Sequence, residues 1–194
     1  LEDVHGGVEG TTLTERVAYS VDKTGYAFDP ARAGLAVDCI SKGIDAVHEM
    51  GLIHRDLTPN NVLCCGFGDS EIFKITDFGL ARPLGMNATF GGIVVGTVGY
   101  APPEQAALDD RRIGTWSDVF TFAVDLYFML TGRGYFPTRN AMDSLALIRS
   151  PERTSILESA MLSPELRSQP AACAGIDLAL RLATSTRPED RPKT

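Results

Sequence analysis

The chain has 194 residues, enough for one domain with its own hydrophobic core. Its hydrophobic fraction of 44% and charged fraction of 22% are ordinary for a globular protein. The 25 acidic and 18 basic residues give a net charge of −7, which argues against a nucleic-acid partner, because binding phosphates needs a basic surface. No apolar run reaches the roughly 18 to 20 residues that a membrane-spanning helix needs, so we expect no membrane segment.

Helix signals dominate the first part of the chain. Residues 1–10 are rich in glycine and are predicted to form a linker. Thr11 or Thr12 could cap a helix that begins there, and Glu15 has the spacing that completes a capping box with Thr12. Asp29, followed by a proline, marks a second helix start, and apolar residues then recur at three- and four-residue spacing. Gly51 is the expected end of this second helix.

The rest of the chain predicts a mainly α fold with one small β-hairpin. Residues 53–65 read as a loop that leads into a short strand, and residues 72–76 as the returning strand. Residues 77–105 are long, irregular and rich in glycine, which is typical of a functional segment. Residues 116–130 are almost wholly apolar and predict a helix buried on all sides. Residues 131–194 are predicted to be helical, with breaks at prolines.

Four cysteines, Cys39, Cys64, Cys65 and Cys173, show no metal-ligand spacing. The adjacent pair lies in the predicted strand, where neighbouring side chains point to opposite faces. We expect all four to be core or near-core thiols of a protein in a reducing compartment, and therefore a cytoplasmic location.

Three oxygen-bearing side chains stand where they can act together. Asp56 and Asn61 lie five residues apart on a loop that leads into a strand, and Asp77 follows the returning strand. A carboxylate can orient a hydroxyl and accept its proton, while amide and carboxylate oxygens are ligands for Mg²⁺. Phosphoryl transfer depends mainly on such positioning and charge neutralisation.

Five segments, in order, resemble the motifs of the eukaryotic-type (Hanks-type) Ser/Thr protein kinase catalytic domain. The first, His-Arg-Asp-Leu-Thr-Pro-Asn-Asn, resembles the catalytic loop, and the second, Lys-Ile-Thr-Asp-Phe-Gly, resembles the metal-binding hairpin. The ordered set is far more specific than any one triplet. The segments are residues 54–61, 74–79, 96–104, 117–132 and 187–192.

The resemblance implies that the chain is the large C-terminal lobe of such a domain, from the hinge to near the final helix. The small N-terminal lobe, with its Gly-rich loop, would be the chain's own upstream partner. The expected parts are a hinge or linker (1–10), first helices (11–53), catalytic loop and metal hairpin (54–80), activation segment (77–105) and helical subdomain (106–194).

ATP and Mg²⁺ are the cofactors that the resemblance implies. Asp56 matches the catalytic base, and Asn61 and Asp77 match the metal ligands. Leu63 matches the apolar side chain beneath the adenine ring. The backbone at two positions of the hinge would meet the adenine edge; these are Glu2 and Val4.

Other residues match structural positions of the family. His54 and Phe78 match a stacked pair that links the metal hairpin to the core. Glu104 and Arg191 match a buried ion pair. Removing one partner would destabilise the fold, because the other charge would stay buried without compensation. Asp118 matches the residue that hydrogen-bonds the backbone of the catalytic loop.

Substrate handling is implied for four positions. Thr97 matches a residue lining the substrate groove, and Arg55 matches an arginine that often grips a phosphate on the activation segment. Phosphorylation of Thr89 is therefore a hypothesis, with an unmodified loop as its alternative. Thr58 stands where Ser/Thr-specific members carry lysine; its hydroxyl can hydrogen-bond the transferred phosphate but cannot neutralise it.

The sequence also supports predictions for four further side chains. Trp116 is predicted to be a packing anchor at the head of the buried helix, and His5 and His48, lacking partners at metal-ligand spacing, to be surface or core residues. Asp125 replaces an apolar residue of the family pattern within that helix. Because an unpaired buried carboxylate is destabilising, we expect Asp125 to find a hydrogen-bond donor.

The sequence thus predicts a Ser/Thr protein kinase that transfers the γ-phosphate of ATP to a hydroxyl of a protein substrate. The alternative is a pseudokinase that acts as a binding or scaffold module. A small-molecule kinase of the aminoglycoside or choline type would explain Asp56 and Asn61, but not residues 96–104 or 117–132.

Overall fold

The computed structural model confirms a mainly helical fold. It describes residues 10–78, 82–83, 99–107, 109–137 and 141–193. Its α-helices are α1 (Leu13–Thr24), α2 (Pro30–Glu49), α3 (Pro103–Ala106), α4 (Thr115–Thr131), α5 (Ala141–Arg149), α6 (Pro164–Arg167) and α7 (Pro170–Ala183). Short 3-10 helices are η1 (Pro59–Asn61), η2 (Gly68–Ser70), η4 (Asp110–Arg112), η5 (Ile156–Glu158) and η6 (Pro188–Asp190).

Two small antiparallel sheets accompany the helices. The first has the order β1-β3-β4, and its hairpin pairs Val62 with Ile75 and Cys65 with Ile72. The second pairs β2 with β5. The strands are β1 (Thr11–Thr12), β2 (Leu52–Ile53), β3 (Val62–Cys65), β4 (Ile72–Ile75) and β5 (Arg82–Pro83).

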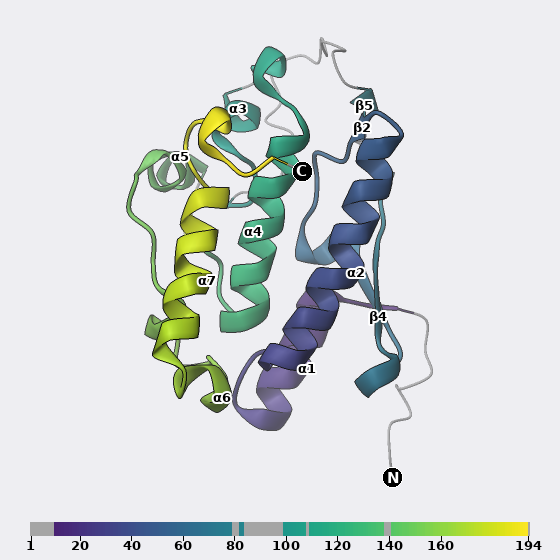
Figure 1. Ribbon diagram of the computed structural model, residues 1–194, viewed down its shortest axis with the longest axis vertical. Coiled ribbons are helices and arrows are strands. Elements are labelled where there is room, and N and C mark those ends of the chain that lie inside the picture. Colours follow the sequence, from purple (N-terminus) through teal and green to yellow (C-terminus); the bar gives the residue numbers. More distant parts are fainter. Residues whose placement is uncertain (1–9, 79–81, 84–98, 108, 138–140, 194) are drawn as a thin grey trace.

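The long helices are stacked in layers (Figure 1). Helix α2 packs on β4 on one side and on α4 on the other, and α7 packs on the far side of α4. The catalytic-loop residues lie between β2 and β3 in the chain, and β2 packs on both α2 and α4.

Local signals in the sequence explain where the first helices begin and end. The Thr12 hydroxyl accepts a hydrogen bond from the Glu15 backbone at 3.2 Å, and the Glu15 carboxylate accepts one from the Thr12 backbone at 2.8 Å. The Asp29 carboxylate caps α2 by accepting from the Arg32 backbone at 2.9 Å. Gly51, at a φ of 72°, follows the end of α2 in a conformation that glycine adopts without strain.

A close approach fixes the distance between α2 and the hairpin. A Cβ atom at Gly43 would lie 3.0 Å from the tip of the Ile75 side chain, so glycine lets the helix pack this near β4 without displacing that side chain. The hydrophobic core runs from this contact through α4 to α7. Its fully buried side chains include Leu13, Phe28, Ile40, Leu57, Val62, Phe120, Met129, Ile156 and Leu180.

A buried ion-pair cluster ties α1 and α2 to the end of the hairpin. The carboxylate of Glu71, 2% exposed, lies 2.7 Å from Arg32 and 3.3 Å from Arg16. Arg16 also donates to the backbone oxygens of Cys64 and Gly66. Since each charged group of this cluster is bonded, it ties β3 and the turn after it to α1 and α2.

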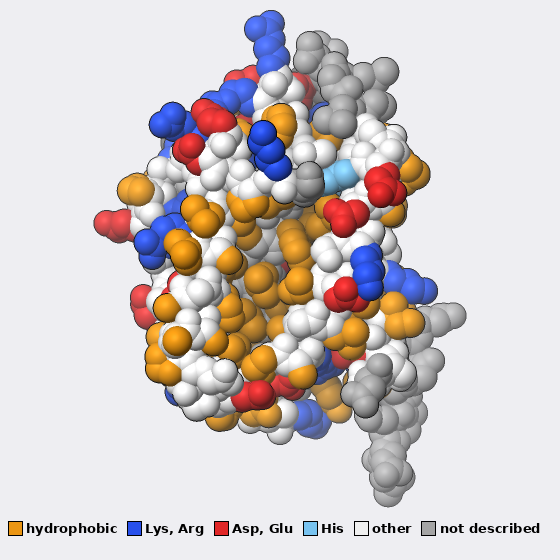
Figure 2. All heavy atoms as spheres, in the orientation of Figure 1, with side chains coloured by type: hydrophobic (Ala, Val, Ile, Leu, Met, Phe, Trp, Pro, Cys, Tyr) orange, Lys and Arg blue, Asp and Glu red, His pale blue; other side chains and the backbone are white. Residues whose placement is uncertain are grey.

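The prediction that α4 is buried on all sides is only partly right. Most of its side chains are buried, but Phe122 and Leu126 are half-buried and Trp116 is 38% exposed. Figure 2 shows a hollow between α4 and α2 that is lined by hydrophobic side chains. Trp116 donates its ring N–H to the Arg112 carbonyl at 2.8 Å, so it braces η4 rather than anchoring the core.

The cysteines agree with the expected packing. All four are free thiols; Cys64 and Cys173 are buried, and Cys39 and Cys65 are half-buried. Burial raises the pKa of the Cys64 thiol to about 12, which makes it a poor nucleophile. Within the described ranges we find no helix with the length and hydropathy to cross a bilayer. The cytoplasmic location stays a prediction.

Candidate active site

The backbone of the catalytic loop is held by one buried carboxylate. Asp118, fully buried on α4, accepts hydrogen bonds from the backbone of His54 and of Arg55, each at 2.9 Å. A ring nitrogen of His48 lies 2.8 Å from the same carboxylate. Both oxygens are therefore engaged, and the loop is attached to the rigid centre of the fold.

Arg55 adopts a backbone conformation that is rare for a residue with a side chain. Its φ is 71°, and its carbonyl accepts a hydrogen bond of 2.7 Å from the buried amide of Gln105. Such a conformation costs about 1–3 kcal/mol and persists only where neighbouring contacts enforce it. Here the contacts are Asp118 on one side and Gln105 on the other. Asp56 is the next residue, so these contacts also fix the backbone that leads into it.

Asp56 and Asn61 are brought into direct contact. The Asn61 side-chain amide donates to the Asp56 carboxylate at 3.0 Å and to the Asp56 carbonyl at 2.8 Å. The Asn61 backbone N–H donates to the Thr58 carbonyl at 2.8 Å, which closes the turn of η1. Because the amide nitrogen is engaged with Asp56, the amide oxygen of Asn61 is left for another ligand.

The hairpin brings Thr76, the residue before Asp77, against Asn61. Thr76 donates its backbone N–H to the Asn61 carbonyl at 2.8 Å, so the residue that follows it lies at the Asn61 end of β3. Asp77 itself has a φ of 56° and an exposed side chain. A ring nitrogen of His54 lies 3.1 Å from the Thr76 carbonyl. Asp56 and Asn61 are thus in contact, and Thr76, the residue before Asp77, is bonded to Asn61.

Phe78 lies against the catalytic loop, where the family pattern expects it. Its ring meets the ring of His54 edge-on, with 5.1 Å between centroids. His54 is 1% exposed, whereas Phe78 is 49% exposed. The pair links the residue after Asp77 to the loop that carries Asp56.

The donor set fits Mg²⁺ that arrives with a nucleotide. Among the described residues no group of three or more His, Cys, Asp or Glu side chains could hold a metal ion unaided. Mg²⁺ in phosphoryl-transfer sites is commonly held by one or two protein oxygens together with substrate phosphates. Asn61 and Asp77 offer one amide and one carboxylate, which is suited to that shared mode.

The position expected to meet the adenine ring lies on β3. Leu63 is half-buried and pairs with Thr12 of β1. A Cβ atom at Gly10 would lie 3.1 Å from the Leu63 side chain, so the chain entering β1 passes close over this leucine.

Glu104 and Arg191 form a fully buried ion pair. The guanidinium meets the carboxylate in a two-pronged arrangement, at 2.7 and 2.8 Å. Ser117 donates to the same carboxylate at 2.7 Å, and Arg191 also donates to the Ser185 and Trp116 carbonyls. This satisfied network joins α3, α4 and the segment after α7.

The expectation for Asp125 is wrong. Its side chain is fully buried, and neither carboxylate oxygen has a hydrogen-bond partner within the described part of the chain. Burial raises the pKa of this carboxyl well above its usual range, and the nearby Asp56 carboxylate raises it further. The pKa of Tyr100 is raised mainly by its own burial and further by the nearby Asp125 carboxylate. This position of the helix faces the core, where the described residues offer it no donor.

Sequence reasoning missed two residues that position the loop. His48 was expected to be a surface or core side chain, but it contacts Asp118, which lies 70 residues further along the chain. Gln105 reaches the Arg55 carbonyl across 50 residues. Neither has a local spacing that points to a partner. The segment just before Gln105 resembles a family motif, and this resemblance is the sequence feature that points to the region of Gln105.

Several residues that the sequence singles out lie outside the part of the chain that the structure describes. Glu2, Val4, Thr89 and Thr97 lie outside the described residues, as does His5. Thr58 is described and is 3% exposed, with its carbonyl bonded to Asn61.

Comparison with known proteins defines the class. The profile of the protein kinase domain matches residues 6–191. The chain therefore belongs to the protein kinase domain family. The site geometry agrees with this class, since the catalytic-loop and hairpin residues that carry the resemblance are also those that the fold brings together.

Individual relatives are serine/threonine-protein kinases by name. A protein of Corynebacterium efficiens named Serine/threonine-protein kinases drp72 is 35% identical over 81% of this chain and 32% of its own length. Pkn1 of Myxococcus xanthus, a serine/threonine-protein kinase, is 32% identical over 84% of this chain and 23% of its own length. PkwA of Thermomonospora curvata, named as a probable serine/threonine-protein kinase, is 38% identical over 57% of this chain. The matched part is at most about a third of these relatives' length.

Proposed function

We propose that the protein transfers the γ-phosphate of ATP to a serine or threonine hydroxyl of a protein substrate. The observation that carries the proposal is the contact between Asp56 and Asn61 at 3.0 Å, with Thr76, the residue before Asp77, bonded to the Asn61 carbonyl. The names of the relatives support the choice of serine and threonine.

Asp56 is proposed as the base. Its carboxylate is half-buried and is oriented by the Asn61 amide, which leaves it able to accept a proton from an incoming hydroxyl. Asn61 and Asp77 would hold Mg²⁺, which neutralises phosphate charge during the transfer. The strained backbone at Arg55 supports this assignment, because such strain concentrates at functional sites.

Other parts of the site are proposed from the family resemblance. Leu63 would pack against the adenine ring, with the backbone of Glu2 and Val4 at its edge. Thr97 would seat the substrate, and Thr58 would hydrogen-bond the transferred phosphate. The N-terminal lobe that supplies the remaining phosphate contacts is proposed as an upstream partner. Thr89 is proposed as a phosphorylation site.

The proposal is tested by phosphate transfer in the full-length protein, with Mg²⁺ and a peptide library containing serine and threonine. Asp56→Asn removes the base but keeps the shape, so we expect transfer to fall by about 10² to 10⁴-fold. Asp77→Asn removes a charged Mg²⁺ ligand, so most of the activity should be lost and the remainder should need more added Mg²⁺. Asp45→Asn, at an exposed aspartate of α2, is the matched control and should leave transfer unchanged.

Two results would contradict the proposal. Transfer that survives Asp56→Asn at the level of the control would remove the proposed base. No transfer by the unmodified protein, with nucleotide or partner binding retained, would favour the scaffold function. The buried Asp125, which has no hydrogen-bond partner among the described residues, is the structural observation that favours that alternative, because it adds a destabilising group near Asp56.

A further inference from the structure

Arg55, the residue before Asp56, is held through its backbone and through its side chain. Its backbone N–H donates to Asp118 at 2.9 Å, and its carbonyl accepts from Gln105 at 2.7 Å. Its guanidinium lies 3.4 Å from the carboxylate of Asp110. Asp110 is therefore part of the environment of the catalytic loop, although it lies 55 residues further along the chain.

The ion pair of Arg55 and Asp110 lies largely out of the solvent. The arginine side chain is 9% exposed and the aspartate side chain 21% exposed. In the pair of Arg112 with Glu189, by contrast, the two side chains are 50% and 59% exposed. Water and salt screen the sheltered pair less, so Asp110 fixes the Arg55 guanidinium more firmly than a surface partner would.

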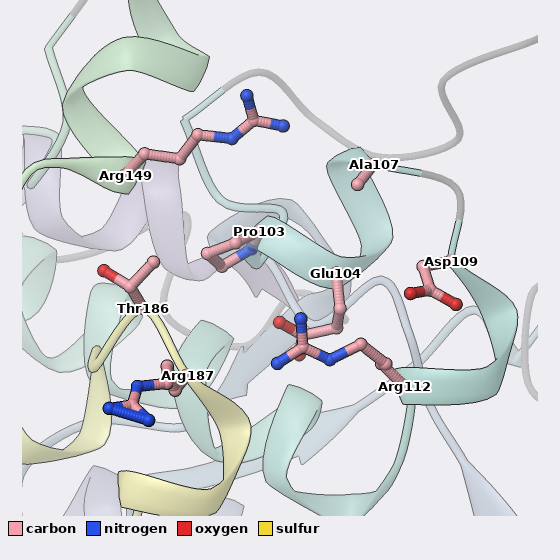
Figure 3. Close-up of a pocket in the computed structure, with 8 residues that line it drawn as sticks. All are labelled: Pro103, Glu104, Ala107, Asp109, Arg112, Arg149, Thr186 and Arg187. Carbon is pink, nitrogen blue, oxygen red and sulfur yellow. The ribbon is translucent and has the colours of Figure 1, made fainter.

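The short helix that carries Asp110 is itself fixed at both ends. Figure 3 shows η4 next to α3, with Asp109 where it begins and Arg112 where it ends. The Asp109 backbone N–H donates to the Glu104 carbonyl at 3.0 Å. The Arg112 carbonyl accepts a hydrogen bond of 2.8 Å from the ring N–H of Trp116. Asp110 lies between these two attachments, so its carboxylate is presented to Arg55 by a braced segment.

A glycine lets the Trp116 ring lie against this segment. A Cβ atom at Gly114 would lie 2.4 Å from the ring, a distance at which the ring would have to move. The Trp116 carbonyl accepts a hydrogen bond from Arg191, whose guanidinium also meets the buried Glu104 carboxylate. The buried ion pair, the tryptophan and η4 thus form one connected unit, and Asp110 is the residue of this unit that reaches the catalytic loop.

Asp110 supplies an anion to Arg55. The family resemblance assigns this arginine to gripping a phosphate on the activation segment. A carboxylate, like a phosphate, offers charged acceptor oxygens to a guanidinium. We propose that Asp110 is a positioning residue, whose carboxylate orients Arg55 and the backbone leading into Asp56 without a phosphate on the activation segment. The effect on transfer rests on the proposed function; the effect on the catalytic loop does not.

The first test is steady-state transfer by the full-length protein to a peptide that it phosphorylates. Asp110→Ala should lower kcat by about 10- to 10²-fold, since a small displacement of a catalytic group costs that much. KM for MgATP should change less, because Arg55 adjoins the proposed base rather than the proposed nucleotide contacts. Asp110→Glu keeps the charge and should restore part of kcat. An unchanged kcat in Asp110→Ala would overturn the positioning role.

Asp109→Asn is the matched control for this test. Asp109 is the neighbouring acidic residue, and its side chain has no hydrogen bond or ion pair within the described part of the chain. The substitution removes the same charge one residue away from Asp110, so kcat should stay at the level of the parent protein. A loss equal to that of Asp110→Ala would show that the charge of the segment, and not the contact with Arg55, matters.

Two further variants identify the partner of Asp110 and the source of the anion. Arg55→Met combined with Asp110→Ala should transfer no more slowly than Arg55→Met alone, because both changes remove one contact. Losses that multiply in the double variant would overturn the proposal. Thr89→Ala, which removes the proposed phosphorylation site, should leave kcat close to that of the parent protein. A loss as large as that of Asp110→Ala would make the phosphate the required anion.

Hydrogen exchange provides a test that needs no transfer. The backbone N–H groups of His54 and Arg55 are bonded to Asp118, so the peptide that contains them should be protected. Its exchange should be faster in Asp110→Ala and unchanged in Asp109→Asn. Asp110→Asn, which keeps the shape and loses the charge, gives the same comparison if Asp110→Ala does not fold. Exchange at the parent rate in the folded variant would overturn the proposal.

The outcomes for Asp110 and for the proposed function are separable. Faster exchange of the catalytic loop in Asp110→Ala, in a protein whose parent transfers no phosphate, would reject the proposed function and keep Asp110 as a residue that positions the loop. Transfer that is lost in Asp56→Asn but normal in Asp110→Ala would reject the positioning role alone.

Discussion

Asp118 and Asp125 lie seven residues apart on α4, and both are fully buried. Asp118 accepts two backbone hydrogen bonds and contacts His48, whereas both oxygens of Asp125 lack a partner within the described residues. Burying a charge is costly only when it is left uncompensated. The same residue type on one helix therefore stabilises the catalytic loop at one position and destabilises the fold at the other.

In the Glu104–Arg191 pair, by comparison, a buried carboxylate is neutralised by a positively charged side chain. Arg191→Met leaves Glu104 buried and without its guanidinium, so we expect a loss of about 3–5 kcal/mol in the free energy of unfolding. Urea denaturation measures it. Arg187→Met, at an exposed pair, is the control and should cost less than about 1 kcal/mol. Equal losses in the two variants would show that burial does not decide the cost.

Asp118→Asn tests the satisfied aspartate of α4. An amide in place of the carboxylate turns one acceptor into a donor, so one buried N–H of the loop loses its partner. We expect the free energy of unfolding to fall by about 1–3 kcal/mol. The transfer rate should fall as well, because the backbone of His54 and Arg55 is no longer fixed. A variant of unchanged stability would contradict the role of Asp118.

Asp125→Leu should have the opposite sign. It replaces an unpartnered carboxyl by an apolar side chain, so we expect the free energy of unfolding to rise by about 1–3 kcal/mol near neutral pH. Calorimetry or urea denaturation detects the gain. A large loss instead would mean that the carboxyl has a stabilising partner in the folded protein.

The pH dependence of stability provides a second test of Asp125. Its pKa in the folded protein is raised, so the folded state holds a proton that the unfolded chain releases above about pH 4. Stability is fully present below that pH and is lost as pH rises through the folded pKa. In Asp125→Asn this decline should be reduced. An identical pH profile in both proteins would rule out Asp125 as its source.

His48→Leu is expected to have the smallest effect. It removes one of the three contacts of Asp118 but leaves both backbone donors in place, so we expect a loss of about 0.5–1.5 kcal/mol. A loss as large as that of Asp118→Asn would mean that His48, rather than the loop backbone, is the main partner of the aspartate.

Much of the fold and of the site was predictable from the sequence by itself. The capping box of Thr12 and Glu15, the cap at Asp29 and the stop at Gly51 involve groups within a few residues of each other. Such signals act locally, so they can be recognised before the chain is folded. The ordered motifs likewise identified the family, and they pointed to Asp56 and Asn61, which the fold brings into contact.

Only the tertiary structure decided which buried groups have partners. His48 meets Asp118, Gln105 meets Arg55, and Glu71 meets two arginines, all across 39 or more residues. The absence of a partner for Asp125 among the described residues is a property of the same kind. Burial and hydrogen bonding depend on which distant segments pack together, and no local pattern encodes that for a single side chain.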